Sequence, residues 1–421
     1  MADILQRPTG TNDILPENGA WRTHVIQLFE DHARRYGYQK VDVPIFERTD
    51  LFARGVGKGT DITEKEMYSF QDRGGEELSL RPEFTAGIVR CYLQNGLHGG
   101  PQPVLFYAVG PLFRYERPQA GRYRQHTQLD VEVLGDGDPS VDVEVIQFAW
   151  ALFERMGLEG LSLHLNSTGC PACRPAYVDA LRDYYEKRTT EICEDCQRRL
   201  ETNPLRLLDC KKEGCQGTVS EAPRITEHLC TGCDGHFDRV RRGLEAISIQ
   251  PVLNSRLVRG LDYYTRTVFE IWAPGIGAQS AVAGGGRYDG LCELLGGPPR
   301  HGMGFGCGLE RLVLTLQEQE EVTVSSSCPQ VYVAPLGEAA SEEAAILCAE
   351  LRREGISARR TFTPRGLKAQ MKAADRTGAK VTILMGEEEL TTGKLTVRFM
   401  DRAQQKQVPR TQIVDLLKEQ V

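Results

Sequence analysis

The sequence of 421 residues has no long hydrophobic run, and no stretch approaches the roughly 18 uninterrupted apolar residues of a membrane-spanning helix. Its first residues, MADILQRPTGTND, lack the basic-then-apolar order of a secretory signal peptide. Internal repeats and long low-complexity segments are not evident either. These absences argue against a membrane or secreted protein and predict a cytoplasmic location.

The sequence also lacks an overall positive charge, since its formal net charge is −7. A basic field over the whole surface, typical of non-specific nucleic-acid binding, is therefore excluded. Charge is uneven along the chain, because residues 328–421 contain 15 Lys and Arg against 12 Asp and Glu. That part carries a charge of +3 and the remainder −10, so local charge has to be considered instead.

Cysteine is not scarce, but the 13 cysteines are an odd number in a long chain. In a reducing compartment such a set indicates free thiols or metal ligands and not a disulfide framework. With 40% hydrophobic residues, the chain has enough apolar content for two or three domains.

Hydrophobic spacing predicts an amphipathic helix over residues 20–36, followed by a series of strands. The strands are expected at 38–46, 103–110, 126–135, 162–167 and 257–271. Pro44 lies inside the first of them, which suggests a sheet edge or an interface. Strand after strand with few long helices between them predicts an α+β fold with a largely antiparallel sheet.

The strand series is interrupted by a cysteine-rich, charged segment that predicts an inserted helical subdomain over residues 169–245. The core domain then comprises residues 1–168 and 246–325. After a polar stretch at 317–330, strands and helices alternate to the end of the chain. Residues 328–421 are therefore expected to form a small α/β domain.

Three stretches carry groups suited to polyphosphate chemistry. Arg114, Glu116 and Arg122 lie between two apolar strand patterns, where guanidinium groups could bind phosphate or simply form a solvated charged hairpin. AVAGGGRYDGL (281–291) has three consecutive glycines that would let a ligand approach the backbone, followed by Arg287 and Asp289. GMGFGCGLERL (302–312) predicts a strand leading into a helix whose first turn carries Glu310 and Arg311.

In combination these stretches resemble a known family. FRYERPQAGRYRQ resembles motif 2 of the class II aminoacyl-tRNA synthetases, GFGCGLERL their motif 3, and the helix and strand ending in VDVPIFE their motif 1, with Pro44 at the dimer interface. LVRGLDYYTRTVFE and AGGGRYDGL resemble two signature stretches of the histidyl-tRNA synthetases of bacterial type, and LRPEFTAGIVR their amino-acid-binding segment. The resemblance covers essentially the whole chain in order. It implies a class II sheet core, a C-terminal anticodon-binding domain, and a homodimer that uses ATP with Mg²⁺, L-histidine and histidine tRNA.

The resemblance also assigns roles to individual residues. Arg114, Arg259 and Arg311 would be catalytic, with Arg259 bridging the substrate carboxylate and the α-phosphate from a strand opposite the hairpin. ATP would be bound by Arg114, Glu116, Arg122 and Arg311. Histidine would be bound by Glu83, Thr85, Gln128, Glu132, Arg259, Tyr263, Tyr264 and Tyr288, of which Glu132 and Tyr264 face the imidazole nitrogens. No editing domain is required, because a polar pocket rejects analogues that leave its groups unpaired.

Two departures from the family pattern fall next to these residues. Phe84 occupies a position where the family usually has glycine, and His126 with Thr127 replaces its Phe-His pair. The Phe84 side chain must therefore point away from the amino-group ligands, or that site is altered.

The cysteine pairs Cys170-x2-Cys173, Cys193-x2-Cys196, Cys210-x4-Cys215 and Cys230-x2-Cys233 have the short spacing of zinc ligands. We expect a structural zinc held by Cys193, Cys196 and two of the four later cysteines (Cys210, Cys215, Cys230 and Cys233), with free buried thiols as the alternative. A second zinc ion would require all eight of these cysteines as ligands. In either case the subdomain is expected to stiffen a surface that clamps the tRNA acceptor stem.

Arg359, Arg360, Arg365 and Lys368 surround a strand-to-helix turn in the C-terminal domain and fit tRNA binding, or else a solvated edge. Two other functions remain open. A histidine-sensing regulatory paralogue would lack adenylate chemistry, whereas the three arginines and the C-terminal domain are present. A zinc-ribbon nucleic-acid-binding protein would leave those arginines unexplained.

Overall fold

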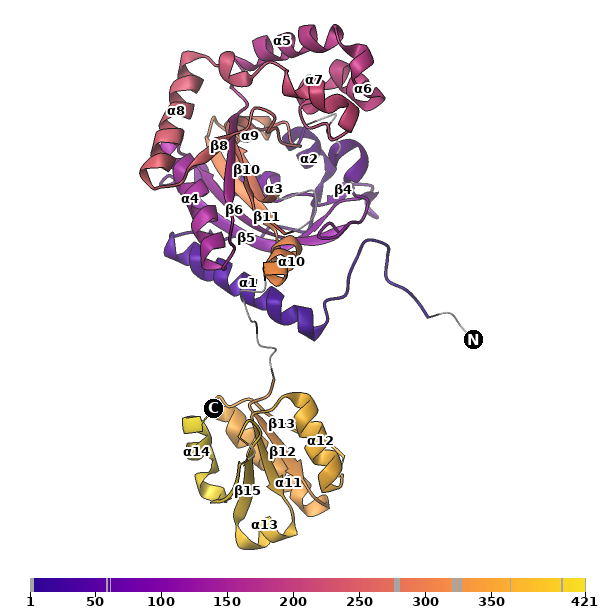
Figure 1. The fold of residues 1–421 in the computed structure, drawn as a ribbon, viewed down its shortest axis with the longest axis vertical. Helices are drawn as coiled ribbons and strands as arrows, with labels where there is room; N and C mark the ends of the chain where they lie inside the picture. Colours follow the sequence, from indigo (N-terminus) through magenta and orange to yellow (C-terminus); the bar gives the residue numbers. More distant parts are fainter. Residues whose placement is uncertain are drawn as a thin grey trace. The chain divides into compact units, whose positions relative to one another are not determined.

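The computed structural model describes residues 4–57, 60, 62–275, 281–319, 324, 328–363, 365–402 and 404–420 (Figure 1). The chain forms two compact units, Met1–Val324 and Ser325–Val421. Half of the polar stretch predicted at 317–330, namely residues 320–323 and 325–327, lies outside the described residues. None of the helices in the described ranges combines the length and the apolar character needed to span a membrane.

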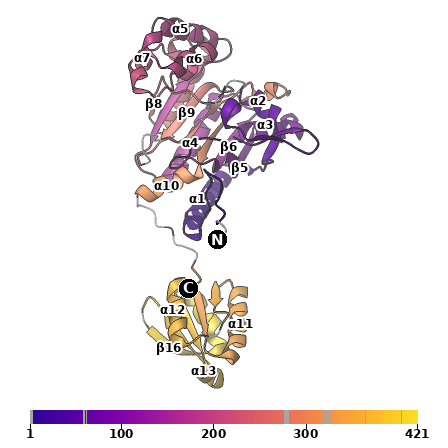
Figure 2. The ribbon, with the colours of Figure 1, turned by 90° about the vertical axis from the view of Figure 1, so that its right-hand side faces the viewer.

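The first unit is built on an eight-stranded sheet in the order β1-β5-β6-β11-β10-β9-β7-β8. Figure 2 labels the strands β5, β6, β8 and β9 of this sheet. The strands are β1 (Gln39–Lys40), β5 (Val104–Phe113), β6 (Gln125–Leu134), β7 (Ser162–Ser167), β8 (Pro251–Leu253), β9 (Thr265–Trp272), β10 (Ala281–Arg287) and β11 (Gly302–Gly308). All inner pairs are antiparallel, while the short edge strands β1 and β8 run parallel to β5 and β7. The prediction of a largely antiparallel α+β core is therefore confirmed, with a mixed arrangement only at the two edges.

Four helices pack with the sheet around one apolar core. They are α1 (Pro16–Arg35), α4 (Pro139–Arg155), α8 (Thr231–Ala246) and α10 (Leu309–Gln319). The helix predicted at 20–36 begins four residues earlier, with proline at its first position, and buries Val25 and Phe29 in this core. It ends before Gly37, whose φ of +79° favours glycine.

A second cluster contains helices α2 (Thr49–Gly55), α3 (Thr85–Gln94) and α9 (Leu291–Leu294), the π-helical turn η1 (Ile62–Glu66), the 3₁₀ turn η2 (Leu97–Gly99) and a small sheet. That sheet has the order β2-β4-β3, with β2 at Phe46–Arg48, β3 at Ser69–Gln71 and β4 at Glu77–Leu80. The predicted strand 38–46 is therefore wrong as a single element. Its two ends join different sheets, and the Arg81 guanidinium, not a neighbouring strand, donates to the Val43 carbonyl.

The predicted strand 257–271 is wrong in its first half, because β9 begins only at Thr265. The preceding residues form a loop whose backbone is bound by tertiary contacts: Asn166 Nδ2 donates to the Leu257 carbonyl at 3.0 Å, and the Asp262 amide to the Val56 carbonyl at 3.1 Å. Arg259, Tyr263 and Tyr264 consequently lie on this loop and not on a strand.

The three consecutive glycines form the strand β10 and not a loop. Arg287, at the end of β10, is completely buried and donates from Nε to Asp142 Oδ2 at 3.0 Å. His236 of α8 lies 3.1 Å from the other oxygen of Asp142. Arg287 therefore ties β10 to α4 and α8 and is a structural residue.

The cysteine-rich segment forms a helical region with its own apolar core around Tyr177, Leu181 and Tyr185. Its elements are α5 (Arg174–Glu186), η3 (Thr189–Glu191), α6 (Glu194–Thr202), η4 (Pro204–Leu207), η5 (Glu213–Cys215), α7 (Gln216–Ser220) and η6 (Ile225–Glu227). The next helix, α8, instead places Phe237 and Val240 in the core of the main sheet. The helical region is thus connected to the sheet through the start of α5 and through α8.

The second unit is a five-stranded sheet in the order β13-β12-β14-β15-β16. Its elements are β12 (Val331–Pro335), α11 (Glu338–Arg353), β13 (Ala358–Arg360), α12 (Leu367–Thr377), β14 (Val381–Met385), α13 (Glu387–Thr392), β15 (Lys394–Phe399), β16 (Gln404–Pro409), η7 (Arg410–Gln412) and α14 (Ile413–Gln420). Sequence patterning missed α13 and β16. β16 is an edge strand whose first four residues are polar and exposed, so it shows no apolar alternation.

Candidate functional site

The first unit contains a cleft of about 1120 Å³ between the β5–β6 hairpin, β10, β11, the start of α10 and the 257–264 loop. Six of the residues assigned to ATP or histidine line it: Arg114, Glu116, Arg122, Gln128, Arg259 and Arg311. Residues that are far apart in sequence therefore surround one cavity.

Each of the three arginines assigned to catalysis is oriented by an anchoring contact. Arg114 Nε donates to the Pro82 carbonyl at 2.8 Å, and Arg311 Nη1 to the Ala281 carbonyl at 2.7 Å. Arg259 Nη1 donates to Glu270 Oε1. Because a guanidinium has five N–H donors, one anchor fixes its plane and other donors serve an anion.

The electrostatic environment of the cleft favours an anionic ligand. Two effects lower the pKa of Arg311: its burial, which is the larger, and the nearby positive charge of Arg122. Glu116 lies 4.0 Å from Arg114 Nη1 and 3.5 Å from Arg122 Nη1, so a single carboxylate is shared by two guanidinium groups. A polyphosphate would supply the negative charge that this cluster lacks.

Glycines on β10 and β11 make room for the side chains of the site. A Cβ at Gly304 would lie 1.8 Å from Glu132 Oε2, and one at Gly306 would lie 2.3 Å from Gln128 Nε2. On the neighbouring strand, a Cβ at Gly284 would lie 2.5 Å from Arg259 Nη1. Because alternate residues of a strand face the same side, Gly304 and Gly306 clear one face of the sheet for ligand-binding side chains.

Four of the residues assigned to histidine form a buried polar cluster and are not among the residues that line the cleft. Tyr288 donates its hydroxyl to Glu132, and the Tyr263 ring centroid is 4.7 Å from that of Tyr264 and 5.8 Å from that of Tyr288. Burial raises the pKa of Glu132 to about 8. The cluster therefore contains a carboxyl group that is easily protonated.

Glu83 and Thr85 lie at the start of α3. Glu83 Oε1 accepts from the Ala86 amide at 3.0 Å, while its buried Oε2 has no hydrogen-bond partner within the described residues. Burial raises the pKa of Glu83. A buried oxygen without a partner is costly, and a ligand ammonium group would satisfy it.

Neither departure from the family pattern obstructs the cleft. Phe84 has an ordinary φ of −94° and is buried in an apolar cluster, where the Arg81 guanidinium lies 4.4 Å from its ring centroid. Thr127 donates its amide to both oxygens of Glu310, at 3.0 and 2.9 Å. His126 lines the cleft. Its burial, and to a smaller extent the positive charge of Arg114, lower its pKa to about 3, so the imidazole is neutral.

Sequence reasoning missed two carboxylates. Glu270 of β9 orients Arg259 and also accepts from Trp272 Nε1 at 2.9 Å. Asp130 accepts from Gln128 Nε2 at 2.7 Å. The signal for Asp130 was available in QLDVEV, because Gln128, Asp130 and Glu132 alternate with apolar residues and so share one face of β6.

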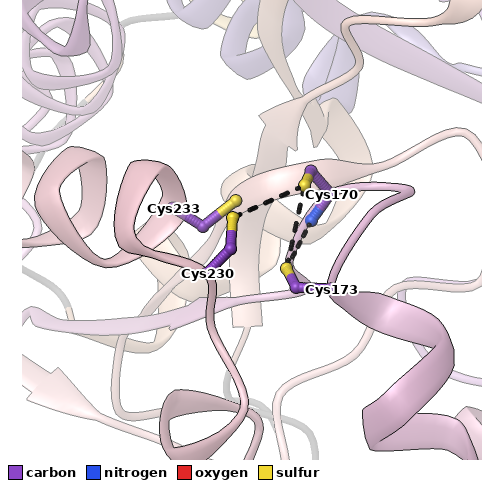
Figure 3. A group of neighbouring side chains, drawn as sticks. All are labelled: Cys170, Cys173, Cys230 and Cys233. Carbon is purple, nitrogen blue, oxygen red and sulfur yellow. Dashed lines mark hydrogen bonds between the residues drawn. The ribbon is translucent and has the colours of Figure 1, made fainter.

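The eight cysteines of the helical region divide into two groups of four. One contains Cys193, Cys196, Cys210 and Cys215, and the other contains Cys170, Cys173, Cys230 and Cys233 (Figure 3). Within each group all sulfur atoms lie within 4.8 Å of one another. Of the four later cysteines considered as partners of Cys193 and Cys196, Cys210 and Cys215 lie beside them, whereas Cys230 and Cys233 do not. The fold pairs them instead with Cys170 and Cys173.

In the second unit, the residues assigned to tRNA lie in β13, in the turn that follows it and in the first turn of α12. Arg359, Arg365 and Lys368 are exposed and Arg360 is half-buried. Phe362 is 80% exposed, and the Arg360 guanidinium lies 5.5 Å from its ring centroid. An exposed aromatic ring among cations is a surface suited to unstacked bases.

Comparison with known proteins identifies the family. Residues 10–312 match the family model described as histidyl-tRNA synthetase, and residues 330–420 match the anticodon binding domain. The histidine–tRNA ligase of Desulforamulus reducens is 49% identical over 99% of both chains, and that of Desulforudis audaxviator is 50% identical over the same shares. The crystal structure of apo S. aureus histidyl-tRNA synthetase superposes with a TM-score of 0.83 at 37% identity, covering 99% of this chain and 100% of that one. The chain belongs to the histidyl-tRNA synthetase family.

Proposed function

We propose that this chain is a histidine–tRNA ligase, which activates L-histidine with ATP and transfers it to the 3′ end of histidine tRNA. The observation that carries the proposal is the cleft that Arg114, Arg259 and Arg311 line together. Three anchored cations suit a polyphosphate, and the buried Glu132–Tyr288 pair offers polar groups for a small polar side chain.

Activation is attack of the histidine carboxylate on the α-phosphorus of ATP, with pyrophosphate as the leaving group. Arg259 and Arg114 would hold the carboxylate and the α-phosphate in line, and Arg311 the γ-phosphate end. Each of the three guanidinium groups is already held by a hydrogen bond to the protein. Their positive charges are therefore in position before negative charge develops in the transition state. Glu116 and Arg122 would contact the adenine and the outer phosphates.

Histidine recognition would rely on the buried polar groups. Glu132 and Tyr264 would face the two imidazole nitrogens, with Tyr263 and Tyr288 as pocket walls. The unpartnered oxygen of Glu83 supports its assignment to the α-amino group, together with Thr85 and Gln128. A pocket of this kind discriminates by roughly 10⁴-fold against side chains that leave its groups unpaired.

Two metals complete the proposal. Mg²⁺ would bind with ATP, where the carboxylates of Glu116 and Glu270 line the cleft, and would neutralise charge on the leaving pyrophosphate. Zinc would bind Cys193, Cys196, Cys210 and Cys215. The Cys193 and Cys210 sulfur atoms are 4.0 Å apart, close to the edge of about 3.8 Å in a tetrahedron of thiolates around zinc.

Two surfaces would bind tRNA. Lys211 and Lys212 line the cleft from the helical region, and Arg256 lines it from the loop after β8, which supports an approach of the acceptor end from that side. The basic turn with Phe362 would bind the anticodon.

A homodimer acting in the cytoplasm is also part of the proposal. Ile45 and Phe46, next to Pro44, are 45% and 54% exposed, as expected of an apolar patch that a second subunit covers.

The test is exchange of labelled pyrophosphate into ATP, measured without tRNA for histidine and for the other nineteen amino acids. Exchange with histidine alone is expected. Exchange with another amino acid would refute the specificity, and histidine binding without any exchange would support the regulatory paralogue.

A further inference from the structure

The second group of cysteines lies where the helical region is attached to the main sheet (Figure 3). Cys170 and Cys173 follow β7, and Cys230 and Cys233 lie at the start of α8. The Cys170 sulfur is 3.8 Å from that of Cys173 and 3.9 Å from that of Cys230, although Cys170 and Cys230 are 60 residues apart. These separations match the edge of about 3.8 Å expected for four thiolates around one zinc ion.

The backbone at the first pair is shaped around the sulfur atoms. Cys170 donates its amide to Cys173 Sγ at 3.3 Å, and the amides of Cys173 and Arg174 donate to the Cys170 carbonyl at 3.1 and 2.9 Å. Gly169 has a φ of +64°, and a Cβ there would lie 2.9 Å from Cys173 Sγ. An N–H donor at a sulfur favours the thiolate, the form that binds a metal.

This same segment is hydrogen-bonded to the part of the chain that carries Tyr264. Thr168 donates its amide to the Arg266 carbonyl at 2.7 Å, and Arg266 donates its amide to the Gly169 carbonyl at 2.8 Å. Arg174, next to Cys173, donates from its guanidinium to the carbonyls of Tyr264 and, at 3.0 Å, of Thr168. A movement of the turn that contains Cys170 and Cys173 would therefore move the backbone of Tyr264.

The contacted segment also needs external support. Arg266 has a φ of +51°, a left-handed conformation that side-chain-bearing residues adopt at a cost. Both backbone groups of Arg266 bond to Thr168 and Gly169, which holds this conformation in place. Tyr263 and Tyr264, which are assigned to histidine, lie three and two residues before this position.

We propose that Cys170, Cys173, Cys230 and Cys233 bind a second zinc ion, which fixes the attachment of the helical region and thereby positions the Tyr263–Tyr264 segment for histidine. The metal site stands on the cysteine geometry alone, whereas its positioning role rests on the proposed function. The cysteines themselves do not touch the substrate.

Zinc content of the purified full-length protein tests the site. Two zinc ions per chain are expected in the wild type and one in Cys230→Ser/Cys233→Ser. The matched variant Cys193→Ser/Cys196→Ser should also retain one, and Cys91→Ser, which removes a thiol outside both groups, should retain two. A wild type that holds one zinc ion, with the same content in Cys230→Ser/Cys233→Ser, would overturn the proposal, as would a disulfide within this group after alkylation and mass spectrometry.

Histidine-dependent pyrophosphate exchange tests the positioning role. In Cys230→Ser/Cys233→Ser the KM for histidine should rise about tenfold, with a smaller change in the KM for ATP. Arg174→Ala provides an independent variant, because it retains all four cysteines: it should keep two zinc ions and still raise the KM for histidine. An unchanged KM for histidine in both variants would refute positioning. Absence of exchange in a wild type that holds two zinc ions would refute the proposed function while leaving the metal site intact.

Discussion

At the scale of single residues, the three arginines of the cleft differ in what holds them. Arg114 and Arg311 are anchored by neutral carbonyl groups, whereas Arg259 is anchored by the carboxylate of Glu270. The Glu270 carboxylate holds the Arg259 guanidinium so close to Gly284 that a side chain at position 284 would clash with it. Of the three arginines, Arg259 is therefore the one fixed both by a carboxylate and by a close backbone contact.

We expect Arg259→Ala to lower the rate of histidine-dependent exchange by about 10²- to 10³-fold, because a preorganised charge on the reacting groups is lost. Histidine binding should be retained in part, since Glu83 and Glu132 remain. Steady-state exchange kinetics and calorimetric histidine binding measure the two effects. Arg182→Ala, which removes an exposed arginine 3.8 Å from Asp179, is the matched control. An exchange rate equal to that of the control would refute the role of Arg259.

Glu132 makes a pH dependence testable. Burial raises its pKa to about 8 in the folded protein, whereas a glutamate in an unfolded chain titrates at about 4.3. Between these values the folded state keeps a proton that the unfolded state has lost, so this group makes stability fall as the pH rises through that interval. We expect Glu132→Gln, which can still accept from Tyr288, to remove this part of the decline.

Thermal unfolding of the ligand-free protein at about pH 5 and about pH 8 measures the difference, since that interval spans most of the titration. The wild type should lose more thermal stability between the two pH values than Glu132→Gln does. Equal losses would mean that Glu132 is not held protonated.

At the scale of elements, β11 shows how glycines, which have no side chain, make room in a strand for neighbouring side chains. Gly302, Gly304 and Gly306 alternate along it, and Cβ atoms there would lie 2.1, 1.8 and 2.3 Å from Tyr288, Glu132 and Gln128 respectively. Glycine in a strand normally lowers stability, so its repeated use indicates a close approach that the site requires.

We expect Gly304→Ala to abolish most histidine-dependent exchange, by about 10²-fold or more, because the new methyl group would displace the Glu132 carboxylate and press on the Val131 carbonyl, 2.5 Å away. Gly19→Ala in α1 has open space around the new methyl group and serves as the control. Circular dichroism should show both variants folded. Wild-type histidine kinetics in a folded Gly304→Ala protein would contradict the close packing seen here.

At the scale of the whole molecule, the two units each bury a core of their own. The described residues that line the cleft belong to the first unit. The activation chemistry proposed for the cleft and the surface assigned to the anticodon therefore belong to different units.

Removal of residues 328–421 should consequently abolish charging of histidine tRNA while sparing histidine-dependent pyrophosphate exchange. Aminoacylation and exchange assays on the same truncated preparation measure the two activities. Loss of both would show that the first unit needs the second to fold or to act.

The sequence by itself determined the features that depend on local patterns. The α1 face, the β5–β6 hairpin with Arg114, the strand-to-helix junction at Arg311 and most of the C-terminal elements follow from periodicity, because neighbouring residues impose it. Together with the six stretches that resemble the family, this was enough to predict the class of fold and the chemistry.

Only the tertiary structure decided the features that depend on residues distant in sequence. The cysteines were assigned to two groups by the return of α8 to the main sheet, which brings Cys230 to Cys170 across 60 positions. The 257–264 segment resembles a strand locally, but long-range hydrogen bonds to its backbone make it a loop. Arg287 follows a glycine-rich sequence typical of ligand loops, yet the packing of α4 and α8 buries it against Asp142. These three features depend on which parts of the folded chain pack against one another, and the spacing of residues along the sequence does not specify that packing.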